Sequence, residues 1–394
     1  MPRQNALQSI CIINGVRTAI GSPLKSLRDF SAAQLGAIVI QSILKRHRIP
    51  KKLVEEVILG NAVSAGTGQN LSRQAAVLAG LPVTVPACTV NQVCGSGLQS
   101  VIVAAHSILC GARNLVVAGG TESASQSPCL YFDDSDDSSA GNKKVESLLH
   151  DGLWCKLTDR HMGHLAEYIV KEFKISRRKQ DEYAFESHRK ACLAQEEGKF
   201  LEEIAAVCIS KTQYFQTDER PRKNINMEKL AALSPAFEKQ GTVTAGNSSV
   251  PCDGAAAVVL AASALVKKWK LTARARILGY SSIAVSPREV FTAGVVAIRT
   301  CLSQCRLSLK DIDLFEISEA FSAQAILTQD KLQIPGEKIN IWGGDIALGH
   351  PLGAAGSRGL VTLLHALRDR KKKKGIVCVC LGGGGAIALA VEII

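Results

Sequence analysis

The chain has 394 residues, of which 46% are hydrophobic and 21% are charged, so it can bury a globular core of two or three domains. No apolar run reaches the roughly 18 residues of a membrane-spanning helix, and the first 17 residues lack a signal-peptide pattern; we expect a cytoplasmic protein without a membrane partner. The net charge of +12 is widely spread and aromatic residues make up only 5%, which disfavours nucleic-acid binding and suits attraction of polyanionic small molecules.

The first part of the chain alternates strand-like apolar runs with helix-like segments. Strands are predicted at 9–14, 54–61 and 114–118, and helices at 32–47 and 97–110. Alternation of this kind predicts a layered α/β fold with parallel or mixed sheets.

The last third of the chain repeats this pattern, with strands predicted at 275–280, 312–317 and 375–381 and helices at 289–305 and 357–367. Two pairs of segments resemble each other. In the first part of the chain, CGSGLQSVIVAAH is followed by RNLVVAGG; in the last third, GAAGSRGLVTLLH is followed by GIVCVCLGG. Each pair comprises a glycine-rich turn, a buried helix, a strand and a glycine cluster. We therefore predict two duplicated halves of one core.

The composition changes between the halves. The acidic, serine-rich stretch 131–144 is predicted to be an exposed loop, and 177–195 a helix. An inserted lid over a rigid scaffold is a common way to build a substrate pocket. The predicted domains are an N-terminal core half, 1–121, completed by about 252–273, an inserted loop or lid domain, 122–251, and a C-terminal core half, 274–394.

The thirteen cysteines do not suggest a disulfide framework, because such frameworks belong to short secreted chains and an odd number leaves one cysteine unpaired. No CxxC pair occurs. Cys378 and Cys380 form a CxC inside an apolar strand, where we expect the two side chains to point to opposite faces. We therefore predict no metal site.

VNQVCGSG places Cys94 directly before a glycine-serine turn and a predicted helix. At a helix N-terminus, the macrodipole and free N–H groups favour a thiolate and can bind an oxyanion. Cys94 is therefore a candidate nucleophile, with a buried structural cysteine as the alternative.

GGDIALGHPLGAAG places His350 in the loop that corresponds, in the second half, to the loop of Cys94. A lone histidine is more often structural than catalytic. Symmetric packing of the halves, however, would bring both helix N-termini to one pocket, where a histidine could activate Cys94.

VCLGGGGA places Cys380 where a buried strand runs into polyglycine. A thiol there could act as acid or base if its pKa approached neutrality; the alternative is a small core residue. The glycines do not form a dinucleotide motif, because no helix with an acidic partner follows.

These three segments, in this order, closely resemble the signatures of the thiolase family. The resemblance implies a duplicated, layered α-β-α-β-α core with an inserted loop domain, and a homo-oligomer, either dimer or tetramer. It covers nearly the whole chain through RTAIG at 17–21, AGGTES at 118–123, HMG at 161–163, GTVTAGNSS at 241–249 and DGAAA at 253–257.

The resemblance further implies Claisen chemistry on acyl-CoA substrates, without a metal or redox cofactor. Cys94 would take an acyl group from a CoA thioester while His350 accepts its proton. Cys380 would then remove a proton from the α-carbon of a second acetyl-CoA, and the enolate would attack the acyl-cysteine. The N–H groups of Cys94 and Gly382 would form an oxyanion hole, and His350 would help to stabilise the enolate oxygen.

The family's CoA-contacting positions carry over to eight residues. Arg222 would lie near the adenine and phosphates and Ser249 near the pantetheine, and the others would form the walls. The full set is Leu153, His161, Arg222, Phe237, Ala245, Ser249, Ala320 and Phe321.

The chain departs from the family at several positions. The usual Asn-Glu-Ala-Phe is SEAF at 318–321, so Ser318 stands where an asparagine holds a water that, with the histidine, stabilises the enolate oxygen. We expect Ser318 to hold this water less well, which would slow condensation. The other departures are Val250, Cys252, Trp342, Asp345 and Gly385.

The HMG motif favours a short-chain, acetoacetyl-CoA type of thiolase. The first alternative is a degradative 3-ketoacyl-CoA thiolase of fatty-acid β-oxidation. A ketoacyl synthase on the same fold is disfavoured by Cys380, because those enzymes lack the second cysteine. The alternative of another class is an inactive CoA-binding or scaffold protein, which the change at Ser318 supports.

Overall fold

A ten-stranded mixed sheet runs through the protein in the computed structural model, which describes residues 10–132 and 143–394. One half of the sheet belongs to the N-terminal part of the chain. Its strands, in spatial order, are β1 (Ile10–Thr18), β12 (Asp253–Ala262), β4 (Leu115–Ser123), β2 (Glu56–Gly60) and β3 (Ala87–Val90), with the short β9 (Ile204–Ala205) beside β1.

The other half of the sheet has the same pattern of strand directions. Its spatial order is β13 (Ala275–Ala284), β16 (Gly385–Ile393), β15 (Lys374–Leu381) and β14 (Leu314–Ile317). In each half, the first two pairings are antiparallel and the next is parallel. The halves meet where β1 pairs with β13. This correspondence supports the predicted duplication.

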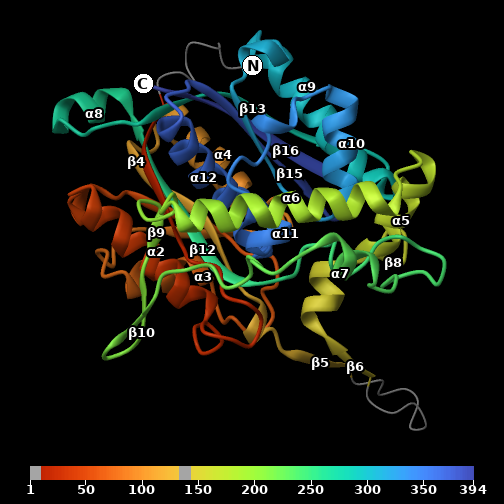
Figure 1. The fold of residues 1–394 in the computed structure, drawn as a ribbon. Coiled ribbons are helices and arrows are strands. Elements are labelled where there is room, and N and C mark those ends of the chain that lie inside the picture. Colours follow the sequence, from red (N-terminus) through yellow and green to blue (C-terminus); the bar gives the residue numbers. More distant parts are fainter. Residues whose placement is uncertain (1–9, 133–142) are drawn as a thin grey trace.

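Helices lie between the two halves of the sheet and outside them, which gives α-β-α-β-α layers (Figure 1). The predicted layered α/β architecture is confirmed. The central layer is α4 (Ser96–Leu109) and α12 (Ala355–Asp369); α2 (Ala32–Arg46) and α3 (Leu71–Leu78) cover the N-terminal half, and α9 (Ala293–Cys305), with α10 (Ser322–Leu332) beside it, covers the C-terminal half.

Glycines in the first turn of each central helix permit the close approach of the two helices. A Cβ at Gly97 would lie 2.7 Å from the carbonyl oxygen of Gly353, and one at Gly356 would lie 2.8 Å from the Cβ of Leu98. Any larger residue would push the two helix N-termini apart. Every residue from Ala355 to Leu367 of α12 is buried, as expected for a helix enclosed between sheets.

The inserted segment adds helices and small hairpins over one face of the core, and α6 runs across its front in Figure 1. The helix predicted at 177–195 is α6 (Arg177–Glu196). Most of the loop predicted at 131–144 lies outside the described residues. The remaining elements of this part are β5 (Cys129–Phe132), β6 (Lys143–Glu146), β7 (Trp154–Cys155), β8 (Arg160–His161), α5 (Met162–Glu172), β10 (Val207–Ser210), β11 (Gln213–Phe215) and α7 (Met227–Ala231).

The helix predicted at 289–305 is wrong in its first part. Pro287–Thr292 forms a 3₁₀ segment in which Glu289 has non-helical φ and ψ of −99° and 17°, and only Ala293–Cys305 is α-helical. Phe291, which lies in this 3₁₀ segment, lines the pocket described below. Two further short helices are α8 (Ser263–Trp269) and α11 (Asp345–Leu348). None of the helices within the described ranges is long and apolar enough to cross a membrane.

Candidate active site

One small pocket collects the three side chains that the sequence singled out for chemistry. Cys94 reaches it from the N-terminal half, and His350 and Cys380 reach it from the C-terminal half. Gly382 also lines this cavity, which has a volume of about 90 Å³. The predicted convergence of the two halves on one site is therefore present in the structure.

Cys94 lies in a tight turn just before α4. The preceding Val93 has a φ of +50°, which is unfavourable for a β-branched residue. The hydroxyl of Ser96 holds the turn: it accepts from the N–H of Gln92 at 2.8 Å and donates to the carbonyl of Val93 at 2.6 Å. Strain held in this way is typical of a turn that presents a functional side chain.

The backbone of His350 is clamped by a segment a hundred residues earlier in the chain. Its N–H donates to the carbonyl of Val250 at 2.9 Å, and its carbonyl accepts from the N–H of Cys252 at 3.2 Å. Gly349 has a φ of +99°, and a Cβ there would lie 2.5 Å from the Sγ of Cys252. Glycine is therefore required directly before the histidine.

The imidazole of His350 is held by a carboxylate. Its Nδ1 lies 3.1 Å from Oδ2 of Asp345; because a carboxylate only accepts, Nδ1 carries the proton and Nε2 is left for Cys94. Burial alone would lower the pKa of His350, but the negative charges of Cys94 and Asp345 outweigh it and raise that pKa to about 10. The site therefore favours a protonated imidazole at neutral pH, held between Asp345 and Cys94.

Cys380 is buried at the end of β15. Burial raises the pKa of its thiol to about 12, and the charge of nearby Cys94 adds to the shift, against a hydrogen bond with the Gly294 backbone. The near-neutral pKa that the acid–base role requires is therefore absent in the free protein. Acylation of Cys94 removes one cause of the shift, because a thioester carries no charge.

The expectation that Cys378 and Cys380 point to opposite faces is wrong. A Cβ at Gly294 would lie 3.4 Å from Sγ of Cys380 and 3.7 Å from Sγ of Cys378, so both side chains face α9. Residues two apart in a strand share a face, because side chains alternate with a period of two. Among the residues that the structure describes, no group of three His, Cys, Asp or Glu side chains is placed to hold a metal ion.

Five of the eight residues expected to contact CoA line the same pocket. The N–H of Ser249 donates to the carbonyl of Ala320 at 3.0 Å, which joins the insertion to the C-terminal half at the pocket wall. The five are Leu153, Phe237, Ser249, Ala320 and Phe321.

The other three residues lie outside this pocket. His161 stacks on the pocket residue Phe237, with a distance of 4.9 Å between the ring centroids. Arg222 and Ala245 are exposed. Their predicted contacts with CoA stay predictions.

Ser318 does not line the pocket either. Its hydroxyl donates to the carboxylate of Asp345, so it reaches His350 only through that residue. The proposed role of Ser318 in holding a water stays a prediction.

Sequence reasoning missed several residues of the pocket wall. Phe291 was placed inside a continuous helix, although the preceding Ser-Pro was a signal for a break. Met162 belongs to the HMG motif but was not assigned to the wall. The further lining residues are Gly152, Ser248, Pro251 and Leu381.

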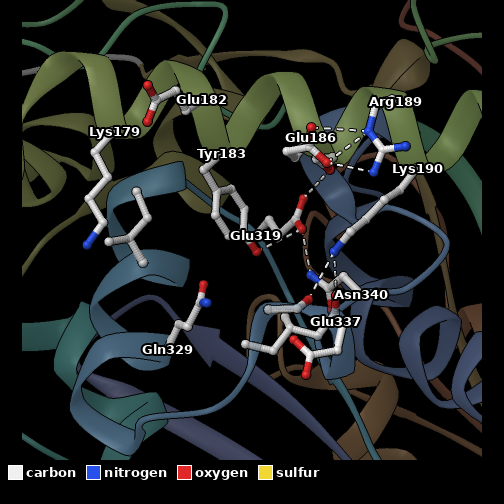
Figure 2. A pocket seen from close by; sticks show the side chains of 14 residues that line it. Lys179, Glu182, Tyr183, Glu186, Arg189, Lys190, Glu319, Gln329, Glu337 and Asn340 are labelled. Carbon is white, nitrogen blue, oxygen red and sulfur yellow. Dashed lines mark hydrogen bonds and ion pairs between the residues drawn. The ribbon is translucent and has the colours of Figure 1, made fainter.

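A larger cleft of about 440 Å³ lies between α6 and the C-terminal half, and none of the three catalytic candidates lines it. Figure 2 shows Glu319 at this cleft, where its carboxylate accepts from Tyr183 at 3.1 Å and Asn340 at 2.6 Å. It also accepts from Ser187 at 2.7 Å. These bonds anchor the loop that presents Ala320 to the pocket.

Comparison with known proteins finds similarity over nearly the whole chain. The family models "Thiolase, N-terminal domain" and "Thiolase, C-terminal domain" match residues 10–264 and 271–393. Acetyl-CoA acetyltransferases of Cupriavidus necator and Escherichia coli are 44% and 46% identical, each over 98% of this chain and 100% and 99% of their own length.

Solved structures show the same similarity. An acetyl-CoA acetyltransferase of Bacillus anthracis has a TM-score of 0.95 at 37% identity, covering 99% of this chain and 100% of the other. Human mitochondrial 3-ketoacyl-CoA thiolase in complex with CoA has a TM-score of 0.95 at 35% identity, covering 99% of both chains.

Proposed function

Because this chain belongs to the thiolase family and is therefore an acyltransferase, we propose that it interconverts two acetyl-CoA with acetoacetyl-CoA and free CoA. The observation that carries this proposal is the common pocket of Cys94, His350 and Cys380. The family's substrates are acyl-CoA thioesters and CoA, which need no further cofactor in the scheme below.

In the first step, the sulfur of Cys94 attacks the thioester carbonyl of acetyl-CoA. The proton of Cys94 passes to Nε2 of His350, and the tetrahedral oxyanion is stabilised by N–H groups at the start of α4. Collapse breaks the bond to the CoA sulfur, which leaves with the proton from His350. Cys94 then carries the acetyl group.

In the second step, Cys380 first gives its own proton to His350, which is neutral after the CoA sulfur has left. The resulting Cys380 thiolate then removes an α-proton from a new acetyl-CoA. His350 and the backbone N–H of Gly382 stabilise developing oxyanions. The α-carbon attacks the acetyl carbonyl on Cys94, the bond to the Cys94 sulfur breaks, and acetoacetyl-CoA leaves. Thiolysis is the same sequence in reverse.

The pocket favours a short acyl group. Its volume of about 90 Å³ is small beside the roughly 300–1,000 Å³ of typical ligand pockets. Three phenylalanines close it, with ring-centroid distances of 6.2 Å between Phe237 and Phe321 and 5.3 Å between Phe291 and Phe321. A long acyl chain would have to displace these rings, of which Phe291 and Phe321 are buried.

The direct test is a thiolysis assay that compares acetoacetyl-CoA with a long-chain 3-ketoacyl-CoA. We expect kcat/KM to be at least tenfold higher for acetoacetyl-CoA. Preference for the long chain would replace the proposal with the degradative 3-ketoacyl-CoA thiolase, and turnover of neither substrate would favour an inactive CoA-binding protein.

The pocket wall gives a second prediction, in which Phe291→Leu relaxes chain-length selection. The smaller side chain opens space next to the acyl site, so the ratio of activity with 3-ketohexanoyl-CoA to that with acetoacetyl-CoA should rise by roughly tenfold, a typical value for a few methylenes. The matched control is Phe315→Leu, which alters a buried phenylalanine outside the pocket. An equal rise in the control would show that loosened packing, and not the wall, sets the selection.

A homo-oligomer also remains part of the proposal. Sedimentation velocity measures the oligomeric state, and a monomer at assay concentrations would contradict this part of the proposal.

A further inference from the structure

Asp345, one of the positions at which the chain departs from its family, is a fully buried carboxylate beside the catalytic pocket. Its Oδ2 accepts from Nδ1 of His350 at 3.1 Å, from the hydroxyl of Ser318, and from the N–H of Glu319 at 3.2 Å. Its Oδ1 accepts from Nη2 of Arg358 at 2.8 Å. Both carboxylate oxygens therefore have fixed partners.

The carboxylate of Asp345 lies beside two basic side chains, Arg358 and His350. Burial would raise the pKa of Asp345, but Arg358 and His350 hold it well below its ordinary range, so the carboxylate is ionised. Arg358 is 1% exposed and also lies 3.5 Å from Glu316, whose pKa burial raises to about 8. With Glu316 largely protonated at neutral pH, the ionised Asp345 is the carboxylate that lies between the two cations, Arg358 and protonated His350.

We propose that Asp345 is a positioning residue for the reaction proposed above, on which this inference rests: it fixes the ring of His350 with Nε2 toward Cys94 and stabilises the thiolate–imidazolium pair. A neutral imidazole that donates from Nδ1 to Asp345 has its lone pair on Nε2. The S–H proton of Cys94 moves to that lone pair, and the resulting imidazolium is attracted by Asp345 on one side and the thiolate on the other. The proton later leaves with the CoA sulfur, and the pair is restored when the acetyl group has left Cys94 in the second step.

Asp345 acts through His350 and touches no substrate atom in this scheme, as the acid of a Cys-His or Ser-His triad does. Other ionisable groups lie on the elements that pack around the Asp345–His350 pair. They are Cys94 before α4, Cys380 on β15, Glu316 on β14, Glu319 in the loop that follows it, Cys252 before β12, Arg220 in the insertion beside Cys252, and Arg358 on α12.

The test measures alkylation of Cys94 by iodoacetamide as a function of pH, without any CoA compound, with the modified cysteine identified by mass spectrometry. In Asp345→Asn, the imidazolium loses its buried anion, so the Cys94–His350 pair should become reactive only at higher pH. We expect the pH of half-maximal alkylation to rise by at least one unit while the rate at high pH is retained. Acylation by acetyl-CoA at neutral pH should fall by roughly 10²–10⁴-fold.

The matched control is Glu316→Gln, which makes the same carboxylate-to-amide change beside the same arginine without contacting His350. Its alkylation profile should coincide with that of the wild type. An unchanged profile in Asp345→Asn, or an equal shift in Glu316→Gln, overturns the proposal.

If Asp345→Asn does not fold, ¹⁵N NMR of histidine-labelled wild-type protein decides the same point. Nδ1 of His350 should stay protonated across the neutral range, and an unprotonated Nδ1 overturns the proposal. Because alkylation needs no substrate, a shifted profile in a protein without thiolase turnover rejects the proposed function alone. Normal turnover with an unshifted profile rejects the role of Asp345 alone.

Discussion

Replacing Cys94 with alanine is expected to lower both thiolysis and condensation by roughly 10⁴–10⁶-fold, because no other group can carry the acyl chain. Cys94 is half-buried in the pocket, at the start of α4 and beside His350. Incubation of the wild type with acetyl-CoA should add one acetyl mass, and Cys94→Ala should abolish that addition. Intact-protein mass spectrometry with peptide mapping measures both.

A suitable control is Cys110→Ala, which removes an exposed thiol at the other end of the same helix. This variant should acylate and turn over like the wild type. Acetylation that maps to another cysteine, or that survives in Cys94→Ala, would contradict the assignment of the nucleophile.

The second large effect is expected for Cys380→Ser, which should become acylated at a rate within a few-fold of the wild type yet lose condensation. A serine hydroxyl is a far weaker acid than a thiol, so it cannot serve as the base for the α-proton; losing such a group costs roughly 10²–10⁴-fold. Exchange of the methyl hydrogens of acetyl-CoA with heavy water should be lost in parallel. The two steps of the reaction are thereby separated experimentally.

The protonation of Cys380 explains why it acts second. Burial and the charge of Cys94 keep its thiol protonated in the free protein, and acylation of Cys94 removes that charge. Cys378→Ser is the matched control, since Cys378 lies on the same face of β15, two residues away and outside the pocket. Normal condensation by Cys380→Ser would show that Cys380 is a core residue and not the base for the α-proton.

Local sequence patterns were sufficient for most of the fold. Apolar periodicity located β2, α2, α4 and α12 within two or three residues, because a helix or strand that packs against a core must repeat its apolar residues with its own period. The resemblance of the three glycine-rich segments to thiolases is confirmed by the family matches. The strand β16 and the helix α3 were not predicted: β16 begins directly at the end of the polyglycine motif, and α3 has only eight residues.

The sequence by itself also determined the three chemical candidates. Cys94, His350 and Cys380 each stand where a helix or strand meets a glycine-rich turn, and such turns are local features of the chain. The duplicated pattern further predicted that the first two would meet. Their residue types and neighbours were therefore enough to name them, although their roles remain predictions.

The tertiary structure alone decided which distant residues complete the site. Val250 and Cys252 clamp His350 through hydrogen bonds across a hundred residues of chain, Phe291 enters the pocket through a break in a helix, and Asp345 binds the imidazole. The same holds for Ser318, which donates to Asp345 instead of lining the pocket. Periodicity reports which face of an element is buried but not which side chain it meets, because that partner is fixed by the packing of elements far apart in the sequence.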